Sequence, residues 1–203
     1  MQNEILFLAG DTDPDVSNGI IDAMTDNYWD IPEGKRKEVI DTLLATGDPS
    51  TLARVVDMVF VNIEAIKVEN LEELLDEIVS KSSPQIRHSL LKSYSTNFSR
   101  MPGVHRDIIA NTLKRILTQV SDQLSFIYVL VEMFEKATPQ EHSILKDYCQ
   151  NPDPKLAGEI AELVKADIPG KALEEILMWI SMDVDEEVRK KADGIDIDDI
   201  EIE

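Results

Sequence analysis

Apolar residues recur three and four positions apart along most of the chain, which is the spacing of one face of an α-helix. No long stretch alternates with the period of a β-strand, except near the C-terminus. The pattern predicts an all-α protein. The clearest stripes are Leu52, Val55, Val56, Val59, Phe60 and Ile63; Val39 to Leu44; Leu71 to Val79; and Leu173 to Ile180. The helices are expected near 2–9, 14–27, 33–46, 49–66, 70–81, 84–96, 104–119, 122–136, 139–149, 154–165, 170–181 and 185–192.

The stripes repeat at a nearly constant interval. Pro14, Pro49 and Pro84 are 35 residues apart, and Pro154 follows 70 residues after Pro84. Ser121 and Asp185 occupy the same position in two copies without proline, so the interval averages near 34. A fixed period of this size is the signature of stacked helical repeats, because one helix pair cannot bury its apolar surface alone.

A polar residue precedes each repeated proline. Asp13, Asp48, Ser83 and Asp153 stand where a side-chain oxygen accepts from the first amides of a helix. Proline lacks the amide hydrogen that would be unsatisfied at the next position. Each copy therefore predicts a helix, a short turn and a second helix.

These turns resemble those of HEAT-like repeats. The stretches "TGDPSTLARVV", "SKSSPQIRHSLL", "NPDPKLAGEIAEL" and "MDVDEEVRKKA" carry the likeness through Asp-Pro followed by an aliphatic residue and arginine. The resemblance implies a right-handed α-α superhelix, a solenoid of about five to six helix pairs over residues 1–192. It also implies a structural pairing of Asp48 with Arg54, and of Asp183 with Arg189. A tetratricopeptide array and a non-repeating helical bundle are the alternatives.

The charge balance limits the classes of partner. The net charge is −20, which repels nucleic acid and anionic membranes from the molecule as a whole. The apolar stretches are too short to span a bilayer, the start does not look like a signal peptide, and the single cysteine allows no internal disulfide. We expect a cytoplasmic protein.

No catalytic or cofactor-binding group emerges from the residue pattern. "DTDPDVSNGIID" spaces its acids like a calcium loop, but Val16 replaces the glycine that the loop requires. His88, His105 and His142 lack a second ligand at metal spacing, and Cys149 has no nearby base. The expectation is a protein without enzymatic activity, metal or cofactor.

The basic segment 81–119 is the exception in an acidic chain, since it holds seven Lys or Arg residues and one acid. Clustered charge of one sign raises the local potential and suits an acidic ligand or partner, although such residues also serve as ordinary solvated helix faces. The candidate partner-binding residues in or beside it are Arg54, Arg87, His88, Lys92 and Arg106.

Residues 193–203 form an acidic tail in which isoleucine alternates with Asp or Glu. The period of two suits an extended segment that docks on another surface, while a solvated terminus is the simpler expectation. Docking on the basic segment, within one chain or between copies, is the sharper hypothesis. At the other end, Tyr28 and Trp29 are expected to pack against the helices they connect.

Together these patterns favour a non-enzymatic module that binds or scaffolds another protein or peptide, with a homo-oligomer through the tail as an option. One alternative is an acidic regulator that mimics the charge of nucleic acid and occupies a basic partner. The other is an accessory subunit of an enzyme or lyase complex.

Overall fold

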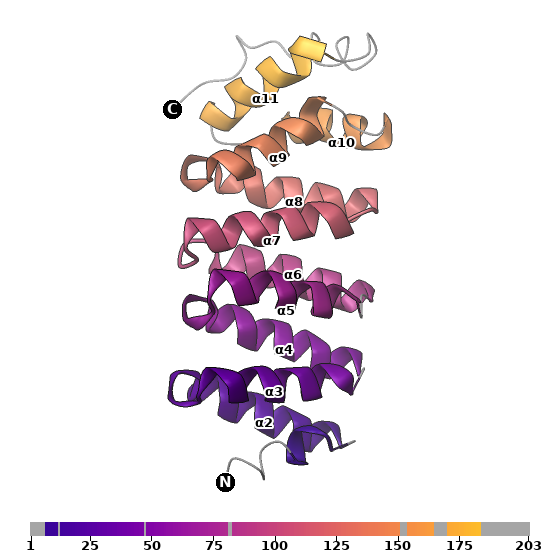
Figure 1. The fold of residues 1–203 in the computed structure, drawn as a ribbon. Helices are drawn as coiled ribbons and strands as arrows, with labels where there is room; N and C mark the ends of the chain where they lie inside the picture. The colour runs from indigo at the N-terminus through magenta and orange to yellow at the C-terminus, as the bar shows by residue number, and fades with distance from the viewer. Residues whose placement is uncertain are drawn as a thin grey trace. The chain divides into compact units, whose positions relative to one another are not determined.

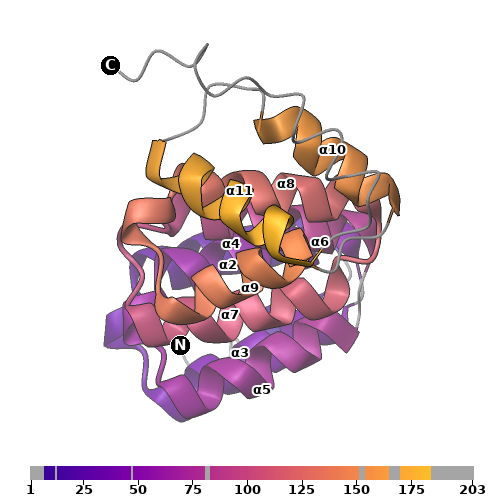
Figure 2. The ribbon, with the colours of Figure 1, turned by 90° about the horizontal axis from the view of Figure 1, so that it is seen from above.

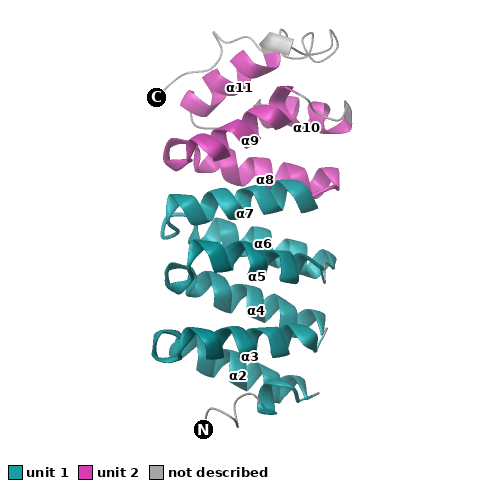
Figure 3. Cartoon of the chain, in the orientation of Figure 1, with its two compact units in different colours: residues 1–116 teal, residues 117–203 magenta. Residues whose placement is uncertain are grey.

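The computed structural model describes residues 7–11, 13–46, 48–80, 83–150, 154–164 and 170–183. Within these residues the chain is helical and contains no strand, so the predicted all-α class is confirmed. The chain divides into two compact units, residues 1–116 and residues 117–203 (Figure 3).

From residue 14 onward, the described part of unit 1 contains six α-helices and two short 3-10 helices. The order along the chain is α2 (Pro14–Asp26), η1 (Tyr28–Asp30), α3 (Glu33–Ala45), α4 (Pro49–Val61), η2 (Ile63–Ala65), α5 (Val68–Ser80), α6 (Pro84–Asn97) and α7 (Gly103–Ile116).

Successive helices of unit 1 alternate between two layers. Helices α2, α4 and α6 pack on one another in one layer, and α5 packs on α7 in the other, which also holds α3 (Figures 1 and 2). The layers are closed by contacts such as α3 with α4 and α6 with α7. The core lies between them and includes Leu43, Leu44, Val55, Val56, Val59, Leu71 and Leu75.

Unit 2 repeats this alternation. Its elements are α8 (Val120–Glu132), η3 (Phe134–Lys136), α9 (Pro139–Gln150), α10 (Pro154–Val164) and α11 (Gly170–Asp183). Helix α8 packs on α10 and on α9, while α11 packs on α9 and on η3. Ile144, Leu145, Ile160 and Ile176 are buried among these helices.

The predicted helix starts are confirmed at the repeated prolines. Asp13, Asp48 and Ser83 each accept a hydrogen bond from an amide in the first turn of the helix that follows. The caps of α2, α4 and α6 therefore recur at the interval of 35 residues that Pro14, Pro49 and Pro84 define. The last predicted helix, 185–192, and the tail 193–203 lie outside the described residues.

A second repeated residue ends the same three helices. Asn27, Asn62 and Asn97 are also 35 residues apart, and each side-chain amide donates to the carbonyl oxygen four residues earlier. These bonds satisfy carbonyls that a helix end leaves without partners. An asparagine at 62 explains why the predicted helix 49–66 is split into α4 and η2.

The pairing expected between Asp48 and Arg54 is wrong. The Asp48 carboxylate accepts from the Ser50 hydroxyl and from the Thr51 amide, at 2.5 and 2.7 Å, so the cap occupies it. The Arg54 guanidinium instead pairs with Asp22 on α2. The aspartate–arginine contact thus joins neighbouring helices of one layer rather than the start and middle of one helix.

Candidate functional site

Two cations of the basic segment 81–119 make contacts with other elements of unit 1. Among its described cations, Arg115 pairs with Asp76 on α5, and Arg100 donates to the Val61 carbonyl oxygen over 2.7 Å. Both contacts join elements about one repeat apart. These cations therefore serve internal contacts within unit 1.

The five candidate partner-binding residues fall in different environments. His88 and Lys92 are exposed one turn apart on α6, and Arg87 beside them is half-buried. Arg54 on α4 forms an ion pair with Asp22 on α2. Arg106 is only 9% exposed and its guanidinium carbon lies 4.1 Å from the centroid of the Phe98 ring. Only His88 and Lys92 are openly presented to a partner.

The stack of Arg106 on Phe98 belongs to a repeated arrangement. Arg36 lies over Tyr28 with 4.7 Å between guanidinium carbon and ring centroid, exactly two repeat intervals earlier in both residues. In unit 2, His142 stacks on Phe134 with 4.4 Å between ring centroids. In each case a cationic or imidazole side chain in the first turns of one helix covers the aromatic residue of the preceding turn.

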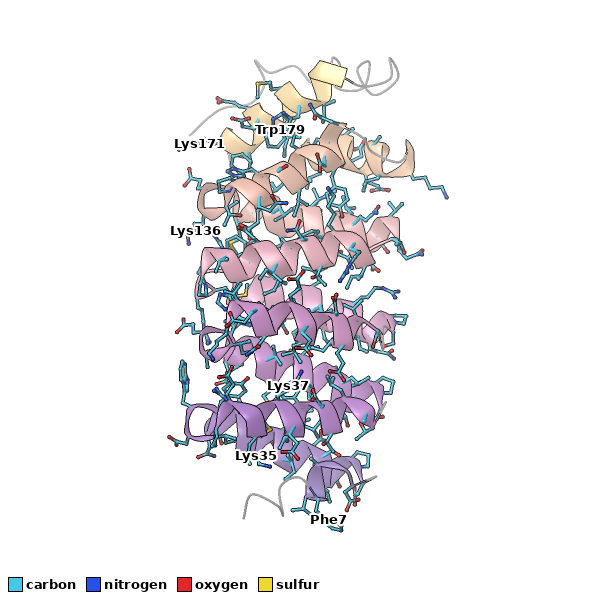
Figure 4. All side chains as sticks on the ribbon, in the orientation of Figure 1. Phe7, Lys35, Lys37, Lys136, Lys171 and Trp179 are labelled. Carbon is cyan, nitrogen blue, oxygen red and sulfur yellow. The ribbon has the colours of Figure 1, made fainter. Side chains whose placement is uncertain are left out.

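A half-open cavity lies where α3 faces α5. Its volume is about 320 Å³, and we refer to it as the α3–α5 groove. Lys37 and Lys35, which project from α3, are labelled in Figure 4. The apolar part of the lining comes from Tyr28, Ile40, Ala65, Ile66 and Leu74. The polar part comes from Glu33, Arg36, Lys37, Asp41, Lys67 and Asn70, and Gly34 completes it.

Two ion pairs connect α3 to α5 beside the groove. Lys67 bonds Glu33 over 2.8 Å, and Lys37 bonds Glu73 over 2.9 Å. The hydrogen bond from Lys67, together with one from Asn70, holds the pKa of Glu33 below its usual value. The bonds to Glu33 and Glu73 raise the pKa values of Lys67 and Lys37. Glu33, Lys67 and Lys37 therefore stay charged around neutral pH.

Arg36 is the unpaired cation of the groove. Its side chain is half-buried, and its Nη1 atom is buried without a hydrogen-bond partner. The carboxylate of Glu33, which lines the same cavity, is already bonded to Lys67 and Asn70. A buried donor without an acceptor costs about 1–3 kcal/mol, so a ligand oxygen that reaches this guanidinium gains more than a surface contact would.

Exposed apolar side chains occur at the turns next to the groove. Trp29 follows the groove residue Tyr28 in η1 and is 68% exposed, whereas Tyr28 is buried. The expected packing of these aromatics is thus confirmed for Tyr28 and wrong for Trp29. Val61, the last residue of α4, and Val104, in the first turn of α7, are also exposed. Phe7, the first described residue, is also exposed (Figure 4).

Several residues that the sequence analysis considered as metal ligands form hydrogen bonds with the backbone. Asp11 and Asp13 accept from the amides of Asp13 and Asp15, and no cluster of three metal-ligating side chains occurs in the described part of the chain. His105 Nε2 and His142 Nε2 lie 2.7 and 2.9 Å from carbonyl oxygens. None of the described helices is long and apolar enough to cross a bilayer.

Comparison with known protein families, characterised proteins and solved structures finds no significant match. The structure itself defines only a general class, that of all-helical proteins with regular helix spacing. The resemblance to HEAT-like repeats lies in the sequences of the turns and identifies no family.

Proposed function

We propose that the chain is a HEAT-like α-solenoid that binds another protein or peptide and catalyses no reaction. The alternation of helices between two layers supports the repeat, and so do side-chain contacts between residues about one interval apart. Such contacts link Lys37 to Glu73, Ser93 to Asp57, and Lys171 to Glu135. Stacked repeats present equivalent helix faces side by side, and such surfaces commonly receive extended ligands.

The observation that carries the proposal is the α3–α5 groove. It combines an apolar floor with a few convergent polar groups, which is the usual composition of a binding site. Its ion pairs fix the polar groups in place before a ligand arrives, so little ordering of these side chains opposes binding.

Glycine 34 allows the groove to be blocked without disturbing the fold. A Cβ atom added to Gly34 would meet no heavy atom within 4 Å, and the same is true of Gly19 on the exposed face of α2. Gly34→Phe therefore places a large side chain at the groove, while Gly19→Phe is the matched control on a helix that does not line it.

The test is selection from a random peptide library, in free-acid and amide forms, on the immobilised full chain. Peptides should be enriched by the wild type and by Gly19→Phe but lost on Gly34→Phe. Circular dichroism checks that all three proteins have the same helix content. If no peptide is enriched, or if Gly34→Phe enriches the same peptides, the α3–α5 groove is not a peptide site and the proposal fails.

The acidic-regulator alternative has one feature in its favour, the exposed acids of α5. Glu69, Glu72, Glu73 and Asp76 face solvent on one helix. Glu73 and Asp76 are already paired with Lys37 and Arg115, however, which halves the uncompensated charge. A charge mimic needs dense unpaired acids, so the groove supports peptide binding better.

A further inference from the structure

We infer that the α3–α5 groove receives the C-terminal end of a partner chain whose last residue is apolar and whose preceding residues are basic. This inference rests on the proposed function and narrows it to one class of ligand. Three features of the groove carry it: the unpaired guanidinium, the apolar floor beside that guanidinium, and the acids that surround both.

We expect the guanidinium of Arg36 to bind one carboxylate of the ligand. Arg36 has a buried Nη1 atom with no acceptor, and its guanidinium carbon lies over the ring of Tyr28, another residue of the cavity lining. Planar guanidinium groups bind carboxylates through two parallel hydrogen bonds. The side-chain carboxylate of Glu33 is occupied by Lys67 and Asn70, so the ligand has to supply the anion.

We expect the apolar floor of the α3–α5 groove to bind an apolar side chain of the ligand that lies close to that carboxylate. Ile40 and Ile66 are buried, and Leu74 is half-buried at the same cavity. A volume of about 320 Å³ lies at the lower end of the range for ligand sites, so it holds a short stretch of chain rather than a segment that runs through. A terminal residue carries its carboxylate and its side chain on the same Cα atom, which matches this short separation.

The carboxylates near the groove disfavour a ligand that carries further acidic residues. The lining residues Glu33 and Lys67 are paired with each other, and Lys37 is paired with Glu73. Asp41 also lines the groove, and Glu69 and Glu72 are exposed on α5 beside the lining residues Asn70 and Leu74. These carboxylates repel an acidic segment such as the tail 193–203 and attract lysine or arginine. A partner end with one carboxylate and basic residues before it satisfies both conditions.

The probe is a synthetic hexapeptide that ends in leucine and carries two lysines upstream, titrated into the full chain by calorimetry. The free acid should bind at least about tenfold more tightly than its C-terminal amide, because the amide loses a charge-assisted pair. Equal affinities would overturn the inference. If groove-dependent peptides were still selected from the library in amide form, the proposed function would survive that result.

Variants locate the bound carboxylate. Arg36→Gln should remove the preference for the acid over the amide, and Arg36→Lys, which keeps a cation, should retain part of it. Gly34→Phe should abolish binding, and Gly19→Phe should bind like the wild type. An acid preference that persists in Arg36→Gln would place the carboxylate elsewhere and contradict the inference.

Two further ligands test the role of the basic residues that precede the terminal residue. N-acetylleucine carries the same apolar side chain and carboxylate without the basic residues, and it should bind more weakly than the hexapeptide. Equal affinity would show a site for small acids rather than for a chain end. A hexapeptide with glutamates in place of the lysines should also bind more weakly, and tighter binding would refute the role of the acidic surroundings.

Discussion

At the scale of single residues, short polar side chains at constant spacing fix the ends of α2, α4 and α6. Asp48 begins α4 and Asn62 ends it, and both side chains bond to the backbone of the helix, with the Ser50 hydroxyl as a second donor to Asp48. The hydrogen bonds from Ser50 and Thr51 hold the pKa of Asp48 below its usual value of 3.8.

Asp48→Ala should lower the melting temperature because the amide of Thr51 loses its acceptor, whereas Asp48→Asn should retain most of the stability. The ionised cap stabilises the fold above the unfolded-state pKa, and this contribution disappears as the pH falls through the lower folded-state pKa. The difference between wild type and Asp48→Asn should therefore shrink in acid, as measured by thermal melts between pH 3 and pH 7.

Ser50→Ala is the control, since it removes the largest cause of the lowered pKa. Its melting temperature should depend less on pH over the same range. An unchanged pH dependence would mean that Asp48 does not govern the acid response.

Cys149 on α9 is 1% exposed, and burial raises the pKa of its thiol to about 12. The thiolate is the reactive form, so the native protein should resist iodoacetamide at pH 8 and react fully in denaturant. The raised pKa also has a consequence for stability. Below the unfolded-state pKa the thiol is protonated in both states, and above it only the unfolded state loses the proton, so stability should fall as the pH rises beyond about 9.

Cys149→Ala should reduce that alkaline loss, with urea unfolding at pH 8 and pH 10 as the measurement. Tyr148, whose pKa is raised to about 12 by burial, remains in the variant and leaves a residual slope. Rapid alkylation of the native wild type at pH 8 would contradict the buried position of the thiol.

At the scale of helices and turns, the aromatic–cation stacks join each turn to the helix after it. Phe98 precedes α7, and Arg106 within α7 covers its ring. At the equivalent positions one interval earlier, Ile63 and Leu71 are both fully buried and apolar. The same place in the fold thus accepts either an apolar pair or an aromatic–cation pair.

A double-mutant cycle with Phe98→Leu and Arg106→Met should give a coupling of about 0.5–2 kcal/mol in the free energy of unfolding, as expected for a partly buried cation over a ring. Urea unfolding of the four proteins measures it. A second cycle that pairs Phe98→Leu with Lys92→Met, an exposed cation on α6, should give a coupling near zero. Equal couplings in both cycles would rule out a specific contribution of the stack.

Most helix positions could be predicted from the sequence because each helix buries one apolar face and therefore shows the helical period. The break at Asn62 falls inside the predicted helix 49–66, although the spacing of 35 residues between Asn27, Asn62 and Asn97 is visible in the sequence; the end of α6 at Asn97 agrees with the predicted helix 84–96. The α3–α5 groove could not be predicted, since it depends on how far α3 stands from α5. The candidate Arg106 illustrates the same limit: charge alone does not tell a stacked, buried guanidinium from an exposed one.

At the scale of the whole molecule, charge is the dominant property. The net charge is −20, while ion pairs such as Lys37 with Glu73 are exposed and individually weak. Self-repulsion of the folded chain therefore outweighs the attraction within its surface pairs.

Added salt should raise the melting temperature, because screening relieves repulsion among the excess acids more than it weakens the pairs. Thermal melts at pH 7 in low and moderate sodium chloride measure this, and potassium chloride should act alike if the effect is screening. A melting temperature that falls with salt would show that the ion pairs dominate.

The matched intervals of helix starts and helix ends also bear on how such a chain changes in length. Residues 49–83 hold one complete period, and their removal would join Asp48 directly to Pro84. The new junction would again be a capping acid followed by proline at the first helical position, with Asn97 still closing the helix. Loss of this whole period would therefore leave the capped start and the closed end of the helix intact.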